Sequence, residues 1–430
     1  MKRIVTILIL CLILTLALPV FAAGAAAESS SEIFSARDLS ASYDEEVFSI
    51  TLSGNTASSD SDRVAVSGST VTVNGPGTYL VSGTLANGGI VVNADKQDKV
   101  QLVLNGVSIS SDTGAAIYVA QADKVFVTLA EGTSSTLTNG GRFAQTEDSA
   151  ADAVIYAKDD LTLNGSGSLV INSPAGHGIA GKDDVTVTGG NYSITSSDSA
   201  VTANDTLAVA GGSFQITSGK DGLHSENSDD DTLGAIYIAG GSFLIRAGDD
   251  AVHAESLLQI DGGSLDITAA EGLEATYIRI NDGQISISAT DDGVNAAYKS
   301  SAYTPTVEIN GGTLTVTMGQ GDTDGIDSNG NLIITGGTVN VTASSAFDYD
   351  GTASFTGGTL IINGQQVDTL PNQMMGGRGG MMGGGRGGMM GDPNAMTGDP
   401  GAMMGGGHGG MMGDPNAMAG GPGMYARKNR

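Results

Sequence analysis

IYIAGGSFLI, residues 236–245, is one of eight related copies that lie between Val185 and Ile362. Each copy follows the order apolar-x-apolar-x-Gly-Gly-polar-apolar-x-apolar, with Asp-Gly in place of Gly-Gly in the copy from Ile278. The copies begin at Val185, Leu207, Ile236, Leu258, Ile278, Val307, Leu332 and Ala353, so that successive starts are 20 to 29 residues apart. A repeat of this length is typical of a solenoid, in which each unit buries its apolar face against its neighbours.

The alternation within each copy predicts strands. Apolar and polar residues alternate on both sides of the glycines, which is the period of a β-strand and not of a helix. The Gly-Gly pair lies where the chain must turn, and glycine adopts positive φ there at little steric cost. We therefore predict an all-β parallel β-helix of about a dozen coils, stacked roughly 4.8 Å apart. Two inward columns follow, the first being Val187, Val209, Ile238, Ile260, Ile280, Ile309, Ile334 and Phe355, and the second Ile194, Ile216, Ile245, Ile267, Ile287, Val316, Val341 and Ile362.

The N-terminal composition indicates secretion. Two basic residues precede an apolar run from Ile4 to Phe21, and small residues follow it, which is typical of a signal peptide over residues 1–27. A retained membrane anchor is the alternative. Cys11 is the single cysteine and lies inside this run, so the processed chain would contain no disulfide. No second apolar segment is long enough to span a bilayer. We expect a secreted, extracellular protein, with cell-surface association left open.

The rest of the chain divides by composition. Residues 28–45 form a leader, and the repeats predict a β-helix domain over residues 46–370. From Pro371 onward glycine is dense and 13 of the 15 methionines occur, a composition that prevents a packed core. We predict a disordered tail over residues 371–430, either a passive spacer or a segment whose thioethers bind a soft metal.

The net charge of the chain is −28. A nucleic-acid partner is disfavoured, because phosphate binding requires clustered lysine and arginine. The acidic residues indicate cations or cationic partners, or serve solubility alone.

A second repeated phrase, acid-Gly/Ala-apolar-polar, lies between the strand pairs. Its copies begin at Asp221, Asp250, Glu271, Asp292 and Asp324, and a degenerate copy begins at Ser345. In a stack these acids form a ladder, and two carboxylates about 4.8 Å apart repel by about 1 kcal/mol in water and by more at a protein surface. Ca²⁺, which prefers hard oxygen ligands, would relieve this repulsion. The predicted calcium ligands are Asp221, Asp250, Glu271, Glu274, Asp291, Asp292, Asn295, Asp322, Asp324, Asp327 and Asp348. A solvated acidic edge that prevents aggregation is the alternative.

Two histidines follow the first two acids of this phrase. His224 and His253 each stand three residues after an aspartate. Imidazole is a poor calcium ligand, so we expect these side chains to contact the bound ligand or a neighbouring acid. A zinc pair is a weaker alternative, since their spacing matches no known zinc motif.

Two coils are longer than the others, at residues 226–231 and 297–303. Insertions in a solenoid often form loops on the binding face. In the second loop, we expect Tyr298 and Tyr303 to stack on a sugar ring and Lys299 to pair with a uronate. An ordinary polar turn is the alternative.

Catalytic signatures are weak. A calcium-dependent lyase needs a base beside the metal, and Lys220 is the best candidate, although it also fits a surface counter-charge. Gly176-His177-Gly178 matches one polygalacturonase motif, but no Arg-x-Lys follows it within the repeats. Paired acids such as Asp249 and Asp250 recur on several coils, which suits repeated ion sites better than one acid/base pair. We assign no catalytic residue.

Several stretches carry a family resemblance. KVQLVLNGVSI (99–109), AVIYAKDDLTLNGSGSLVI (153–171), HGIAGKDDVTVTGGNYSIT (177–195) and the Asp-Gly turns resemble secreted bacterial β-helix proteins of the carbohydrate-binding domain-containing family. The resemblance covers roughly residues 50–363. It implies a right-handed parallel β-helix similar to polysaccharide lyases, with bound calcium, that binds cellulose and acidic plant polysaccharides. The family's Asp-Gly turns fall on Asp221, Asp292 and Asp324, whereas Asp250 and Glu271 vary the pattern.

The chain contains no tryptophan, so the flat platforms that bind crystalline cellulose are missing. We therefore predict a secreted, calcium-binding and non-catalytic protein that recognises acidic plant cell-wall polysaccharide such as pectin, with cellulose left open. The alternatives are a calcium-dependent polysaccharide lyase and a structural cell-surface adhesin.

Overall fold

The computed structural model describes residues 33–43, 46–144, 151–320 and 323–372, and the secondary-structure elements of these ranges are all β-strands. The all-β prediction is confirmed. Among the described residues, no helix has the length and apolarity needed to cross a bilayer. The predicted signal peptide (1–27), the predicted calcium ligand Asp322 and all but two residues of the predicted tail (371–430) lie outside the described residues.

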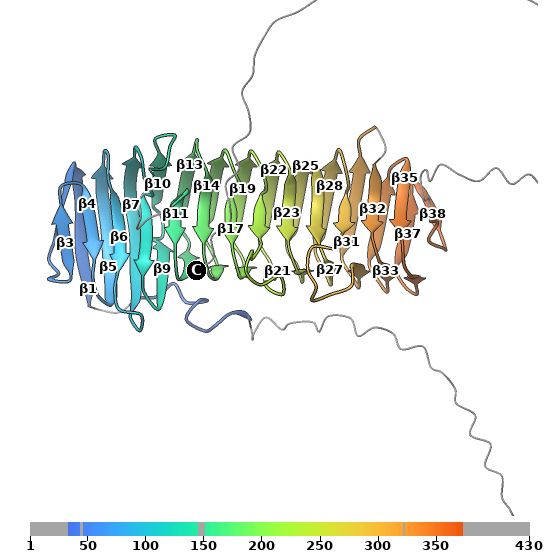
Figure 1. Ribbon diagram of the computed structural model, residues 1–430, viewed down its shortest axis with the longest axis horizontal. Helices are drawn as coiled ribbons and strands as arrows, with labels where there is room; N and C mark the ends of the chain where they lie inside the picture. The colour runs from blue at the N-terminus through green and yellow to red at the C-terminus, as the bar shows by residue number, and fades with distance from the viewer. Residues whose placement is uncertain (1–32, 44–45, 145–150, 321–322, 373–430) are drawn as a thin grey trace, which may run out of the picture. The chain divides into compact units, whose positions relative to one another are not determined.

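The strands form two sheets, one of 25 strands and one of 13, whose neighbours are mostly parallel (Figure 1). Each coil of the repeat region contributes two strands to the larger sheet and one to the smaller. Each strand pairs in parallel with its equivalent on the next coil, as β15, β16 and β17 do with β18, β19 and β20. The sequence repeat is therefore one coil of a stack.

The strand bounds follow this order. The first strands of the coils in the larger sheet are β9 (Lys124–Leu129), β12 (Asp160–Gly165), β15 (Val185–Val187), β18 (Thr206–Val209), β21 (Ala235–Ile238), β24 (Leu257–Ile260), β27 (Tyr277–Ile280), β30 (Thr306–Ile309), β33 (Asn331–Ile334) and β36 (Ala353–Phe355). The second strands are β10 (Ser134–Asn139), β13 (Ser168–Ser173), β16 (Asn191–Ser196), β19 (Ser213–Ser218), β22 (Ser242–Ala247), β25 (Ser264–Ala269), β28 (Gln284–Ala289), β31 (Thr313–Met318), β34 (Thr338–Thr342) and β37 (Thr359–Ile362). The smaller sheet contains β3 (Val64–Ser67), β4 (Thr70–Val73), β6 (Gly89–Asn93), β8 (Ile117–Gln121), β11 (Ala153–Ala157), β14 (His177–Gly181), β17 (Val201–Ala203), β20 (Leu223–Ser225), β23 (Asp250–Ala254), β26 (Glu271–Ala275), β29 (Val294–Ala296), β32 (Asp324–Ser328) and β35 (Ser345–Tyr349).

Antiparallel strands occupy both ends of the stack. The larger sheet begins with β1 (Val47–Gly54), β2 (Thr56–Ser59), β5 (Gly77–Leu85) and the long β7 (Lys99–Ser111), and ends with β38 (Gln365–Val367). β2 pairs with β1, β3 with β4 and β38 with β37, all antiparallel. These hairpins cover strand edges that would otherwise offer unpaired backbone groups to another chain.

The pairing register confirms both predicted inward columns. Val187 pairs with Val209, and the pairing continues from coil to coil as far as Phe355. The second column continues in the same way from Ile194 to Ile362. Both columns are buried except at their last members, Phe355 and Ile362, which are half-buried on the final coil.

The turn inside each copy depends on its second glycine. This residue has positive φ in all eight copies, for example 104° at Gly190 and 118° at Gly283. A side chain rarely adopts that conformation. The first position has no such requirement, which explains why Asp282 can replace glycine there.

Residues 33–43 form a strap, as we call this segment, on the outer surface of the larger sheet. The Asp38 carboxylate is buried, lies 2.9 Å from the Lys124 ammonium of β9 and accepts a 2.7 Å hydrogen bond from Thr162 of β12. The Arg37 guanidinium lies 4.5 Å from the ring centroid of Phe126. Arg37 also donates to Gln101 of β7, and Thr188, after β15, donates to the Asp38 carbonyl, so the described part of the leader is attached to several consecutive coils.

Candidate functional site

The smaller sheet aligns the repeated acid phrase from coil to coil. At its first position, Asp250 pairs with Glu271 and Asp324 with Ser345. Three residues later, each member pairs with the next in an outward column of His224, His253, Glu274, Asn295, Asp327 and Asp348. The stack therefore brings side chains that are about 20 to 30 residues apart in sequence into neighbouring positions.

The small second residue of the phrase is required by packing. A Cβ placed on Gly272 would lie 2.3 Å from the carbonyl oxygen of Gly293 on the next coil, and one on Gly222 would lie 2.5 Å from that of Ala251. The acids also bond to the next coil, because the Asp250 N–H donates to Asp221 (3.2 Å) and the Asp324 N–H donates to Asp292 (3.0 Å). The acidic turns thus hold coils together in addition to any role in binding.

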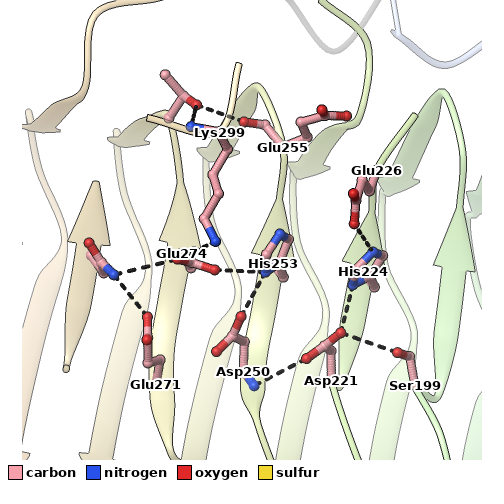
Figure 2. Close-up of polar contacts among 12 residues, drawn as sticks. Ser199, Asp221, His224, Glu226, Asp250, His253, Glu255, Glu271, Glu274 and Lys299 are labelled. Atoms are coloured by element: carbon pink, nitrogen blue, oxygen red, sulfur yellow. Dashed lines mark hydrogen bonds and ion pairs between the residues drawn. The ribbon is translucent and has the colours of Figure 1, made fainter. Parts of the chain in front are cut away.

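On the first three coils of the column, histidine and lysine side chains lie among the acids (Figure 2). His224 Nδ1 lies 2.6 Å from Asp221 Oδ2. His253 Nδ1 lies between Asp250 Oδ2 at 2.7 Å and Glu274 Oε2 at 2.8 Å. The Lys299 ammonium lies 2.8 Å from the other oxygen of Glu274. The histidines therefore contact neighbouring acids, which was one of the two expectations for them.

These contacts set the charge of the buried groups. Burial opposes a charge on His253, but hydrogen bonds to Asp250 and Glu274 outweigh it and raise the pKa of His253 to about 10. Burial likewise opposes ionisation of Glu274, but His253 and Lys299 outweigh it and lower its pKa to about 2. His253 is thus an imidazolium at neutral pH and supplies the positive charge of this part of the column.

The following coils contain acids without such partners. Within the described part of the chain, no lysine, arginine or histidine forms an ion pair with Glu271, Asp292, Asp327 or Asp348. Burial, followed by repulsion from Asp292, Asp324 and Asp348, raises the pKa of Asp327 to about 7. Burial is also the main cause that raises the pKa of Glu271 to about 7 and that of Asp292 to about 6.

Buried oxygen atoms without a hydrogen-bond partner gather on the same coils. They are Asn295 Oδ1, Thr323 Oγ1, Ser345 Oγ and Asp348 Oδ1. The amide nitrogen of Asn295 donates to Glu271 (3.0 Å), which leaves its carbonyl oxygen as the free end. Carboxylate, amide and hydroxyl oxygens are the hard ligands that Ca²⁺ accepts, so these residues fit the predicted ion.

A cavity of about 580 Å³ lies over the smaller sheet beside the column. Its lining includes the predicted ligand residues His224, His253 and Lys299. Lys299 already bonds to Glu274, so its ammonium is not free in the way that the sequence suggested. His177, Lys220, Glu226, Ser228 and Asp249 also line the cavity, and the sequence had indicated them or their loop without assigning them to the sugar ligand; the lining further includes Lys182, Asp198, Ser199, Thr202 and Asn204. Thr202 aligns with His224 of the repeated phrase, which was the available signal for this residue.

The two long loops meet at this edge of the sheet. The backbone N–H and hydroxyl of Ser301 both donate to the Asp231 carboxylate at 3.0 Å. Tyr298 is 71% exposed, as a stacking platform requires, whereas Tyr303 packs edge-to-face on Tyr277 at 5.7 Å. Asp291, a predicted calcium ligand, is exposed.

Comparison with known proteins identifies a family for most of the chain. A family model described as carbohydrate-binding domain-containing protein matches residues 67–323 and 270–371, which is most of the chain. The chain belongs to this family. A carbohydrate-binding domain-containing protein of Acetivibrio thermocellus is 37% identical over 135 residues, 31% of this chain and 47% of that protein. The chain thus spans about half the length of this curated family member.

Among solved structures, the chain is similar to one described as the polysaccharide lyase-like protein from C. thermocellum, gadolinium derivative. The match covers 74% of this chain and 97% of that one, with a TM-score of 0.45 and 23% identity.

Proposed function

We propose that this member of the carbohydrate-binding domain-containing family is a secreted, non-catalytic protein that binds acidic polysaccharide of the pectin type with the help of Ca²⁺. The stack is then a right-handed parallel β-helix of about a dozen coils, and the cavity over its smaller sheet is the sugar site. Family membership supports carbohydrate as the partner. The arrangement of charges beside the cavity supports an acidic sugar with a cation.

The calcium proposal rests on the later coils of the column, those of β29, β32 and β35, which we call the uncompensated half. Asp292, Asp327 and Asp348 have no ion-pair partner in the described ranges, and buried oxygens of Asn295 and Ser345 lack hydrogen bonds there. These side chains, together with Asp324, would hold the ion. A bound Ca²⁺ supplies positive charge that protein carboxylates and a uronate can share. His253 and Lys299 already neutralise the first coils, so the proposal confines the ion to the later ones.

The lyase alternative is disfavoured by the state of its candidate base. The Lys220 ammonium lies 3.1 Å from Asp198, and this hydrogen bond raises the pKa of Lys220. A base must be deprotonated before it can remove a proton from the sugar, so the contact makes Lys220 less suited to that role.

Pull-down on polygalacturonate with and without a chelator tests the proposal. We expect the chelator to abolish binding. Asp327→Asn should weaken binding, because it removes a carboxylate from the uncompensated half. The matched control is Asp266→Asn, which changes an exposed acid on β25 of the larger sheet and should bind as the wild type does.

Three results would contradict the proposal. Binding that persists in chelator would exclude calcium bridging. Absence of binding to acidic glycans would favour the adhesin alternative. A rise in ultraviolet absorbance from unsaturated product would reveal lyase activity.

A further inference from the structure

We propose that the polysaccharide lies along the axis of the stack, with one sugar unit over each of four coils, in a trough formed by the cavity described above. This inference rests on the proposed function and specifies how the same site receives its ligand. It predicts an extended site whose affinity depends on the number of sugar units in the ligand, rather than a pocket for one sugar.

The lining of the cavity extends over five consecutive coils. It takes residues from β14, β17, β20, β23 and β26 or from the turns next to them, and Lys299 reaches it from the loop that follows β29. Neighbouring strands of a sheet lie about 4.8 Å apart, so five coils span about 19 Å. The spacing of the coils is close to the length of one pyranose unit in an extended chain. The trough therefore has room for about four units in register with the coils.

The floor of the trough is a single column. Thr202 pairs with His224, His224 with His253, and His253 with Glu274. The coils of β17, β20, β23 and β26 thus each present one polar side chain at the same position, whereas the β14 coil has the buried Ala180 there. A ligand with a regular repeat can meet an equivalent group at every step, whereas a compact ligand cannot.

The walls run in the same direction. Asp198, Lys220 and Asp249 lie in the turns that precede β17, β20 and β23, and they line one side. The other side is lined by residues that follow the strands, including Glu226 and Lys299. Figure 2 shows Asp221, Asp250 and Glu271 toward one end of the strands, and Glu226 and Lys299 toward the other. A chain laid across the strands would have to cross both walls.

The two ends of the trough differ in charge. At the first coil, the exposed Lys182 lines the cavity, with its ammonium 6.0 Å from the ring centroid of Tyr156. At the last coil, Glu271 borders the uncompensated acids. A uronate can pair with Lys182 directly but needs a cation beside Glu271. This asymmetry favours one direction of the sugar chain.

Calorimetry with oligogalacturonates of increasing length, in the presence of Ca²⁺, tests the inference. We expect affinity to rise with each unit, by about tenfold or more in total, and to level off near four units. Lys182→Met changes an exposed residue at one end of the trough, so the variant should fold. It should weaken binding of the tetramer more than that of the dimer.

Thr202→Phe fills the floor of the trough and should lower the affinity for the tetramer by about tenfold or more. Its matched control is Thr217→Phe, on the exposed outer face of β19, with unfolding temperatures measured for both. Affinity that levels off at one or two units would overturn the axial arrangement, as would tetramer binding unaffected by Lys182→Met. Failure of every oligomer and of the polymer to bind would overturn the proposed function itself, and with it this inference.

Discussion

His253 performs inside the column the task that a metal ion was expected to perform. Its Nδ1 lies within 2.8 Å of two carboxylates, and the histidine, Asp250 and Glu274 are nearly buried. Two buried negative charges this close require a positive charge between them. The protonated imidazole provides it without leaving the chain dependent on a cation at these coils.

Substituting His253 by glutamine should therefore destabilise the protein. We expect a loss of about 3 to 5 kcal/mol near pH 6, since the change removes the cation beside the buried Asp250 carboxylate and leaves Glu274 with Lys299 alone. Because the folded-state pKa of His253 lies above the ordinary value of 6.5, the stabilisation is complete below pH 6.5 and disappears as pH rises toward about 10. Urea unfolding of both proteins between pH 6 and pH 10 should show the difference shrinking.

His224→Gln is the matched control, and its loss should be smaller, because one of its two partners, Glu226, is 53% exposed. An H253Q difference that does not change with pH would show that His253 is not the charged group proposed here.

For single residues, the sequence predicted which side chains lie in the candidate site better than it predicted which side chains contact each other. The spacing of the repeated phrase identified the acids and both histidines as one site. It did not reveal that Lys299 bonds to Glu274 or that Tyr303 packs on Tyr277. Those contacts depend on how a loop of one coil folds over another, and the loop at 297–303 has no counterpart on other coils that would show its path.

At the scale of the element, the coil is a unit whose stability depends on its neighbours. Alternation of apolar residues predicted which side chains point inward, and the obligatory second glycine fixed the turn between the strands. The strap could not be predicted in this way. Residues 33–43 lack the repeat, and their attachment depends on Asp38 reaching Lys124 and Thr162 far along the chain.

Isoleucines at equivalent positions on inner and terminal coils should contribute differently to the free energy of unfolding. Ile260→Ala removes a fully buried side chain with a coil on either side, and should cost about 2 to 5 kcal/mol of unfolding free energy. Ile362→Ala makes the same change on the half-buried last coil, and should cost less than about 2 kcal/mol. Equal losses, measured by chemical denaturation, would contradict the stacking of coils as the source of stability.

Attachment of the strap to the larger sheet should depend on the buried carboxylate of Asp38. Asp38→Ala leaves Lys124 without its closest acid, and should cost about 2 to 4 kcal/mol while exposing residues 33–43 to hydrogen exchange. Asp62→Ala, which removes an exposed carboxylate, is the control and should change neither quantity. Unchanged protection of the strap in the first variant would show that other contacts hold it.

At the scale of the whole molecule, the chain has a net charge of −28, and the acids on the smaller sheet are compensated unevenly. His253 and Lys299 neutralise acids on the coils of β23 and β26, whereas the following coils keep theirs uncompensated. Net charge and repeat spacing together predicted an acidic ladder. The division into two halves follows from two cationic side chains, His253 and Lys299, whose neighbours only the coiled structure defines.

This division predicts how stability depends on pH and on Ca²⁺. Folding raises the pKa of Glu271, Asp292 and Asp327 to between about 6 and 7, so each contributes stability that is present below its unfolded pKa and lost as pH rises through that range. In chelator, the unfolding temperature should therefore fall between pH 5 and pH 8.

Added Ca²⁺ should reverse this fall in unfolding temperature at pH 8 and have little effect at pH 5, where protons compete for the same oxygens. Asp327→Asn should flatten the pH dependence in chelator, while Asp266→Asn should leave it unchanged. If Ca²⁺ does not change the unfolding temperature at pH 8, the uncompensated acids form a solvated edge and bind no ion.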